Sequence, residues 1–312
     1  MHGRTLTGRR RIAPRALGLA LAAALLVAEA ALAGDGRVQI NQGAALAGGV
    51  TTQDAPGFPV TISQSGSYVL TGDLVVTDPA LDAIDVRAGG VALDLNGFQL
   101  IGPQVCNGEA NQIVCTPDGP ENEGDGIGSS GAAYPGLIVR NGTIRGFEYG
   151  IQVLHRPLII SNLRVDANAQ RGIETRTSVI VHSSANRNDG AGIQVIDTLI
   201  AHSTVSGNQS GIQLPSIGRS ALVTDVSSRN NGLRVLNGLI TGTSTHTGFG
   251  PGLTIDGCGL IIDSTSRLHN TAALRLGANA AATRTVLVPG SGPAVDGTTK
   301  LPNNLCSGGV CP

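Results

Sequence analysis

Apolar and polar positions alternate in short runs that return about every twenty residues through the middle of the chain. A glycine before each run sets the register, with intervals of 22, 20, 19, 21 and 20 residues between Gly150, Gly172, Gly192, Gly211, Gly232 and Gly252. Gly126-Ile127 begins the series, and Ala272-Ala273-Leu274 continues it without its glycine. A period near twenty that tolerates small insertions indicates a solenoid.

Each repeat carries two aliphatic columns with a polar column between them. The first column holds Ile151, Ile173, Ile193, Ile212, Leu233, Leu253 and Leu274. The second, two residues later, holds Val153, Thr175, Val195, Leu214, Val235, Ile255 and Leu276. The polar column holds Gln152, Glu174, Gln194, Gln213, Arg234, Thr254 and Arg275. This alternation is typical of a strand with one face buried.

The rest of each repeat predicts further short strands and turns. A second apolar stretch begins at Leu158, Val179, Leu199, Ala221, Leu239 and Leu260. We expect a turn near the end of each repeat, at Asn168, Asn188, Asn208, Asn230 and Asn270, because Asn tolerates left-handed backbone. Stacked repeats then form an all-β parallel β-helix of roughly nine or ten rungs, right-handed by the preference for right-handed parallel crossovers.

The two ends of such a solenoid need covering, because an open rung exposes unpaired strand edges. The stretch "VQINQGAALAGG" (38–49) predicts a short capping helix. We therefore expect a signal peptide over 1–33, an N-terminal cap over 34–60, a β-helix over 61–288 with an inserted loop at 103–125, and a C-terminal tail over 289–312.

The first 33 residues have the features of an export signal. Five arginines precede the apolar run "ALGLALAAALLVAEAALA", which ends in the A-x-A form Ala31-Leu32-Ala33. Removal of this segment leaves an exported chain without a transmembrane segment. It also changes the net charge from −1 to −5, since 16 basic and 21 acidic residues remain. An acidic chain gives no electrostatic reason to expect nucleic-acid binding.

The five cysteines suit an oxidising compartment. Cys106 and Cys115 close the short loop "CNGEANQIVC", and Cys306 and Cys311 close "CSGGVC", so we expect two disulfides. Cys258 is left over, and we expect it to be a small buried residue.

Three segments carry a family resemblance: "DAPGFPVTISQSGSYVLTGDL", "VALDLNGFQLIGP" and "VRNGTIRGFEYGI". They are similar to an uncharacterised subgroup of the exported right-handed parallel β-helix proteins of bacteria, which have the pectin lyase-like fold. This broad group includes pectate lyases and mannuronan epimerases, and many of its members handle polysaccharides. The resemblance implies the same fold and a periplasmic or extracellular location.

The polar column is the predicted ligand-binding face. The side chains of Gln152, Gln194, Gln213 and Arg275 would hydrogen-bond a polysaccharide or another cell-envelope component. We expect binding without catalysis, because no paired carboxylates emerge from adjacent repeats. The alternative is a lyase or epimerase acting on uronate-containing polymers, which needs a base and a positive group. Glu174, Arg176 and Arg234 are the candidates for that chemistry.

Two metal sites are further candidates. Glu121, Glu123 and Asp125 precede Gly126 as in the first half of a calcium loop, although position 132 is Ala where a bidentate Glu is expected. Without Ca²⁺, this segment is a solvated acidic loop. His182 and His202 occupy the same position of successive repeats and would suit copper or zinc. Two ligands are too few, so we expect a polar stack at a turn instead.

Overall fold

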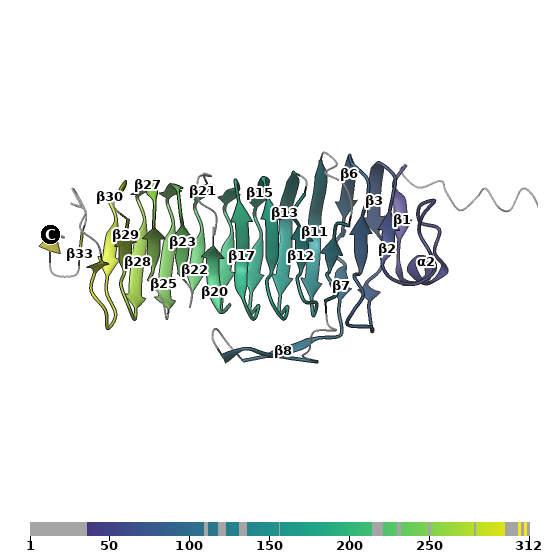
Figure 1. The fold of residues 1–312 in the computed structure, drawn as a ribbon, viewed down its shortest axis with the longest axis horizontal. Helices are drawn as coiled ribbons and strands as arrows, with labels where there is room; N and C mark the ends of the chain where they lie inside the picture. The colour runs from purple at the N-terminus through teal and green to yellow at the C-terminus, as the bar shows by residue number, and fades with distance from the viewer. Residues whose placement is uncertain are drawn as a thin grey trace, which may run out of the picture. The chain divides into compact units, whose positions relative to one another are not determined.

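The computed structural model describes residues 36–312 except 109–111, 118–122, 131–135, 156, 214–220, 230–231, 249–250, 278, 297–304, 307–308 and 311–312. The predicted signal peptide (1–33) lies outside the described residues. Residues Val38–Pro312 form one compact unit. Within this unit the chain coils into stacked rungs of short strands (Figure 1).

The first sheet, called sheet 1 here, takes one strand from each rung. All of its pairs are parallel. Among the described residues it comprises eleven strands: β2 (Val60–Ile62), β5 (Ile84–Val86), β10 (Ile127–Gly128), β12 (Ile151–Val153), β14 (Ile173–Arg176), β17 (Ala191–Ile196), β20 (Ser210–Gln213), β23 (Leu233–Val235), β26 (Leu253–Ile255), β29 (Leu274–Leu276) and β32 (Val295–Asp296). At about 4.8 Å per step, such a stack is roughly 48 Å long.

Two further ladders complete each rung and belong to one continuous sheet. The second ladder contains β1 (Val38–Ile40), β3 (Gly66–Leu70), β6 (Val91–Asp94), the first parts of β11 (Leu137–Arg145) and β13 (Leu158–Asp166), β15 (Ser178–Val181), β18 (Leu199–Ala201), β21 (Ala221–Thr224), β24 (Gly238–Thr241), β27 (Cys258–Ile262) and β30 (Asn279–Thr283). The third contains β4 (Leu74–Val75), β7 (Gln99–Ile101), the second parts of β11 and β13, β16 (Ser184–Asn186), β19 (Thr204–Ser206), β22 (Ser227–Arg229), β25 (Ser244–Gly248), β28 (Thr265–His269), β31 (Val286–Val288) and β33 (Leu305–Cys306). β34 (Gly309–Val310) pairs antiparallel with β33.

The first aliphatic column stacks inside sheet 1, as the repeat predicted. Ile151 lies beside Ile173, Ile173 beside Ile193, and Ile193 beside Ile212. The column continues through Leu233, Leu253 and Leu274. All of these side chains are buried in one core. The predicted parallel β-solenoid is confirmed. The sequence repeats because residues that stack on one another in neighbouring rungs must be similar.

The corners between the second and third ladders are single residues in left-handed conformation. Their φ angles lie between 48° and 54° at Asn162, His182, His202, Asp225, Asp263 and Arg284. Such angles are uncommon outside glycine. Each corner therefore turns the chain within one residue, and this keeps consecutive rungs in register.

Buried asparagines form a ladder at the next corner. Oδ1 of Asn188 accepts from the backbone amide of Asn168 at 3.0 Å and from its Nδ2 at 2.9 Å. Nδ2 of Asn188 donates to Oδ1 of Asn208 at 2.8 Å. Asn270 lies at the turn after β28, as predicted, but it is exposed, and the buried position of this corner is occupied by His269, one residue earlier. Asn230 lies outside the described residues.

The predicted capping helix is present but shorter than expected. Helix α2 spans Gln42–Ala47, and Oδ1 of Asn41 caps it by accepting from the backbone amide of Ala44 at 3.0 Å. The first three residues of the predicted stretch form β1 instead, which pairs with β3. Their alternation buries Ile40 in the core, so they extend the stacked ladder.

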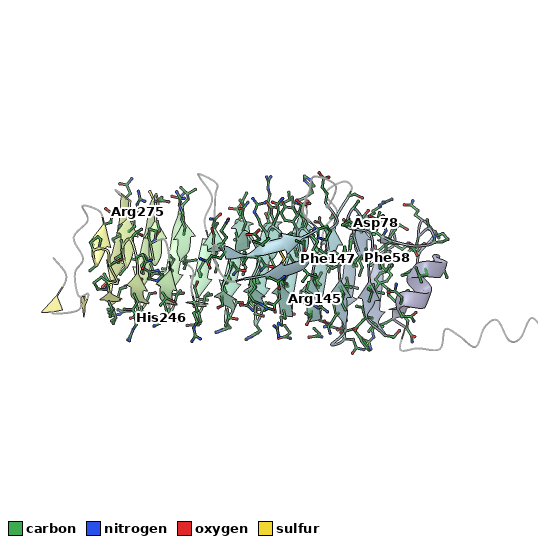
Figure 2. All side chains as sticks on the ribbon, turned by 90° about the horizontal axis from the view of Figure 1, so that it is seen from below. Phe58, Asp78, Arg145, Phe147, His246 and Arg275 are labelled. Carbon is green, nitrogen blue, oxygen red and sulfur yellow. A yellow bond between two sulfur atoms is a disulfide. The ribbon has the colours of Figure 1, made fainter. Side chains whose placement is uncertain are left out.

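A disulfide-linked hairpin leaves the stack between β7 and β10. Its strands β8 (Val105–Asn107) and β9 (Val114–Thr116) are antiparallel, and the predicted disulfide between Cys106 and Cys115 is present. The hairpin runs along the edge of the β-helix in Figure 1 and crosses in front of it in Figure 2. Sγ of Cys115 lies 3.9 Å from the carbonyl oxygen of Asn168, so the hairpin rests on the asparagine corner.

The other cysteines have different outcomes. The prediction that Cys258 is buried was wrong: it is a free, exposed thiol. It begins β27 directly after the turn from sheet 1, where the side chain points away from the core. Cys311 lies outside the described residues, so the pairing of Cys306 with Cys311 stays a prediction.

Candidate functional site

The polar column forms one continuous ladder on the outer face of sheet 1. The strand registers place Gln152, Glu174, Gln194, Gln213, Arg234, Thr254 and Arg275 side by side in this order. They also extend the ladder by Asp85 and Gly128 at the N-terminal end and by Asp296 at the other. Thr254 is buried, whereas Arg234 and Arg275 are exposed. Figure 2 shows Arg275 near one end of the stack.

Glu174 is the centre of a hydrogen-bonded network on this ladder. Its Oε1 accepts from Nε2 of Gln194 at 3.0 Å. Its Oε2 accepts from Nη1 of Arg171 at 2.9 Å and from Nε2 of Gln152 at 3.5 Å. The carboxylate is therefore held in place by three neighbours from three rungs. Such a fixed array of donors and acceptors suits recognition of a hydroxyl-rich ligand.

The three candidates for lyase or epimerase chemistry are not brought together. Arg176 follows Glu174 on β14 and is exposed. Arg234 lies three rungs away, and its Nε donates to Oδ2 of Asp256 at 2.5 Å. At about 4.8 Å per rung, the separation from Glu174 is roughly 14 Å along the stack.

A half-buried tyrosine borders the network. The guanidinium of Arg171 lies over the ring of Tyr149, with its central carbon 5.5 Å from the ring centroid. Nη1 of Arg171 also donates to the Tyr149 hydroxyl at 3.3 Å, and that hydroxyl donates to Oε1 of Gln170 at 3.0 Å. Burial raises the pKa of Tyr149. The phenol therefore stays protonated and is fixed beside Glu174.

Two carboxyl groups meet at the N-terminal end of the same face. Asp82 and Asp125 each stand two residues before an inward isoleucine, Ile84 or Ile127, and these isoleucines pair in sheet 1. The backbone amide of Asp125 donates to Oδ1 of Asp82 at 2.8 Å. A Cβ built on Gly128 would lie 2.5 Å from Oδ2 of Asp82 and 3.7 Å from Oδ2 of Asp125. The missing side chain at Gly128 thus makes room for the Asp82 carboxyl, and Oδ2 of Asp125 lies at ordinary contact distance from the same point.

Both carboxyls have strongly perturbed acidities. Asp125 is only 7 % exposed, and within the described part of the chain its Oδ1 has no hydrogen-bond partner. Burial raises the pKa of Asp125 to about 9, with further increases from the charges of Asp82, Glu148 and Glu174. Burial also raises the pKa of Asp82 to about 6, against a lowering by the Asp125 amide. Asp125 is therefore a neutral acid at pH 7, and Asp82 is largely ionised.

Sequence reasoning missed this carboxyl pair because the interval from Ile84 to Ile127 is 43 residues, about twice the usual period. The signal is nevertheless present. "DAID" (82–85) and "DGIG" (125–128) share an Asp before the small residue and isoleucine that open a rung. Later rungs have Tyr149, Arg171 and Ala191 in place of that Asp.

The described residues of the two predicted metal sites are not arranged as clusters of metal ligands. Glu121 lies outside the described residues, Glu123 is exposed, and Asp125 is buried beside Asp82. His182 and His202 do stack, with ring centroids 5.1 Å apart and planes 10° from parallel. Nδ1 of His202 lies 3.6 Å from Oδ2 of Asp225. Within the described residues, no group of three or more His, Cys, Asp or Glu side chains is arranged to hold a metal ion.

The outer face of the second ladder has the opposite character. Neighbouring rungs place aliphatic side chains outward at Ile138, Ile159, Val179, Leu199, Leu222, Leu239 and Leu260. A groove of about 720 Å³ opens on this face beside Ile138, Ile159, Val179 and Leu199. The carboxyl pair and the Glu174 network lie on sheet 1, so polar and apolar faces are separated by a corner.

Comparisons with known proteins agree with this architecture. A family model described as the right handed beta helix region matches residues 96–231. The fold is therefore a right-handed parallel β-helix, as the resemblance implied. No curated protein matches the chain.

Solved structures with the same fold include a carbohydrate-active enzyme. The chain is similar to the catalytic domain of a GH87 alpha-1,3-glucanase in complex with nigerose (TM-score 0.53, 12% identity, 79% of this chain and 61% of that domain). It is also similar to that domain in complex with tetrasaccharides (TM-score 0.51, 11% identity, 79% and 60%). The A-module of Azotobacter vinelandii mannuronan C-5 epimerase AlgE4 gives a TM-score of 0.44 at 13% identity, over 78% of this chain and 91% of that module.

These likenesses concern the fold alone, and the chain spans about three fifths of the length of the glucanase domains. Among the helices in the described part of the chain, none is long and apolar enough to span a membrane.

Proposed function

We propose that this chain is an exported protein that holds a polysaccharide, or another polymer of the cell envelope, along the polar outer face of sheet 1. The observation that carries this proposal is the network of Gln152, Glu174 and Gln194, which presents amide and carboxylate groups on three successive rungs. A polymer lying across the strands meets a polar side chain at every step of about 4.8 Å.

Two other features support a carbohydrate as the ligand. Arginines at 171, 234 and 275 place guanidinium groups on this face, and guanidinium groups bind carboxylates and hydroxyls. The similar glucanase domain is described in complex with nigerose and tetrasaccharides. Because the chain has no excess of basic residues, a nucleic acid is a poorer partner than a polysaccharide.

Export into the periplasm or beyond the cell is part of the proposal. It is supported by the arginine-rich apolar leader with its A-x-A site. The disulfide between Cys106 and Cys115 adds support, because such bonds persist in oxidising compartments.

The test is binding to defined polymers by the purified protein without its predicted leader. Samples of α-1,3-glucan, polygalacturonate and alginate are compared by pull-down or affinity electrophoresis. We expect retention by at least one of them, and a loss of affinity of about tenfold in the double variant Gln194→Ala, Gln213→Ala, since two hydrogen-bonding groups are removed.

A matched control carries Thr204→Ala and Ser244→Ala, two exposed positions of the third ladder. It should bind like the unchanged protein. Equal affinities of the two double variants, or no retention by any of the polymers, would contradict the proposed face.

A further inference from the structure

The carboxyl pair of Asp82 and Asp125 has a feature that a structural role leaves unexplained. Oδ1 of Asp125 is buried without a hydrogen-bond partner among the described residues, and the side chain is 7 % exposed. An unsatisfied buried polar atom destabilises a fold. Buried polar groups of this kind are rare, and catalytic sites are one of the places that retain them.

The pair also lies where a bound polymer would pass. Gly128 occupies the ladder position between Asp85 and Gln152, and Oδ2 of Asp82 lies above it. The ladder therefore runs from the Glu174 network directly onto the Asp82 carboxylate. Asp125 stands one rung further toward that network, with Oδ2 beside the same point on β10.

We propose that Asp125 and Asp82 hydrolyse a glycosidic bond of the polysaccharide held on sheet 1. This inference rests on the proposed function. Asp125 donates its proton to the glycosidic oxygen as the bond from that oxygen to the anomeric carbon breaks. Asp82 attacks the anomeric carbon, which gives a covalent ester. Asp125 then takes a proton from water, the water oxygen bonds to the anomeric carbon, and the Asp82 carboxylate leaves. Water is the single co-reactant.

The division of roles follows from the environments of the two groups. Asp125, with a pKa raised to about 9, keeps its proton at neutral pH and can act as the acid. Asp82, with a pKa of about 6, supplies a carboxylate at the same pH. Two acidities that are pushed apart in this way define acid and nucleophile in many enzymes.

The spacing selects the stereochemical course. The two Oδ2 atoms lie 2.5 Å and 3.7 Å from one point beside Gly128, so they are at most about 6.2 Å apart. Carboxyl groups separated by about 5–5.5 Å are typical of retaining glycosidases, whereas inverting enzymes need about 6.5–9.5 Å. We therefore expect retention of configuration at the anomeric carbon.

The experiment measures binding and cleavage on the same samples. The protein without its predicted leader is incubated with α-1,3-glucan, polygalacturonate and alginate, and new reducing ends are counted. Asp125→Asn and Asp82→Asn are near-isosteric and keep the acceptor for the Asp125 amide. We expect each to lower the release of reducing ends at least 100-fold while binding is retained. Asp263→Asn, on an exposed corner of the other sheet, should cleave like the unchanged protein.

The outcomes separate this inference from the proposed function. A polymer that binds to sheet 1 without gaining reducing ends overturns the hydrolysis and leaves the binding function standing. Full activity in Asp125→Asn, or products with the ultraviolet absorbance of unsaturated uronates, also overturns it. Inversion seen by proton NMR of the first product excludes Asp82 as the nucleophile. Absence of both binding and cleavage removes both proposals.

Discussion

The backbone amide of Asp125 donates a hydrogen bond to Oδ1 of Asp82 over 2.8 Å, across two neighbouring rungs of sheet 1. The bond holds the Asp82 carboxyl against the rung that carries Asp125. Asp82 gains a donor from this arrangement, whereas Oδ1 of Asp125 gains none. Asp125 is the weaker acid of the pair because it is more deeply buried and because the charges of Asp82, Glu148 and Glu174 raise its pKa further.

The protonation of Asp125 should make stability depend on pH. Because its folded pKa of about 9 lies above the unfolded value, the folded chain holds a proton that the unfolded chain releases. The free energy of unfolding therefore falls as the pH rises from about 4 to about 9. Between pH 6.5 and 8.5 we expect the Tm of the unchanged protein to fall roughly 5 °C more than that of Asp125→Asn.

Scanning calorimetry at the two pH values measures this difference. Asp263→Asn is the matched control, because the Arg284 hydrogen bond lowers the pKa of Asp263 and this carboxyl stays ionised over the whole range. Parallel pH profiles for Asp125→Asn and the unchanged protein would show that Asp125 is ionised in the fold.

Asn188→Ala should destabilise the β-helix strongly. The substitution leaves both the backbone and side-chain amides of Asn168 without an acceptor in a buried corner, and it removes the donor to Asn208. We expect a loss of about 3–5 kcal/mol in the free energy of unfolding, from two or three unsatisfied groups. Urea unfolding followed by circular dichroism gives the value. Asn270→Ala, at an exposed position, should change stability by less than about 0.5 kcal/mol.

Gly150→Ala should be poorly tolerated for steric reasons. A Cβ at this position would lie 2.2 Å from Cγ1 of Val165 and 2.7 Å from the carbonyl oxygen of Gly172. Relief of this overlap would separate adjacent rungs, at a cost of about 1–3 kcal/mol. Gly72→Ala is the comparison, because its nearest neighbour would be 3.7 Å away. Equal melting temperatures of the two variants would refute the close contact at the rung corner.

Cys258 should react with a maleimide in the folded protein without added reductant, because its thiol is free and exposed. Peptide mapping by mass spectrometry should find the label at Cys258 and none at Cys106 or Cys115. The predicted pairing of Cys306 with Cys311 implies that these two also stay unlabelled. Labelling of Cys258 only after denaturation would place it in the interior.

The fold was predictable because the repeat of about twenty residues is directly visible in the amino-acid sequence. Ile173, Ile193 and Ile212 lie directly beside one another in stacked rungs, so each of these positions must be aliphatic. The aliphatic column and its period are therefore visible even where the rest of the repeat varies. The structure differs from the prediction where the local sequence pattern and the pairing between rungs favour different positions. Val38–Ile40 pairs with β3 as a strand of the second ladder instead of beginning the helix. At the asparagine corner, His269 takes the buried position, one residue before Asn270.

The candidate site was only half predictable. The column from Gln152 to Arg275 follows from the period alone, and the structure confirms it as one ladder. Asp82 and Asp125 required the register across the inserted hairpin, which no fixed period supplies. The position of the Asp82 carboxyl also requires that residue 128 has no side chain, and a glycine gives no chemical signal of this in a sequence.

The one-residue corners at His182 and His202 make the molecule extensible in whole units. Copying a segment of about twenty residues into the middle of the chain would insert a complete coil and displace the remainder as a rigid body. The proposed binding face would then lengthen by a single rung, while the rungs at either end stayed as they were. Duplication of such a segment therefore changes the length of the stack in steps of one rung and leaves the elements at its two ends unchanged.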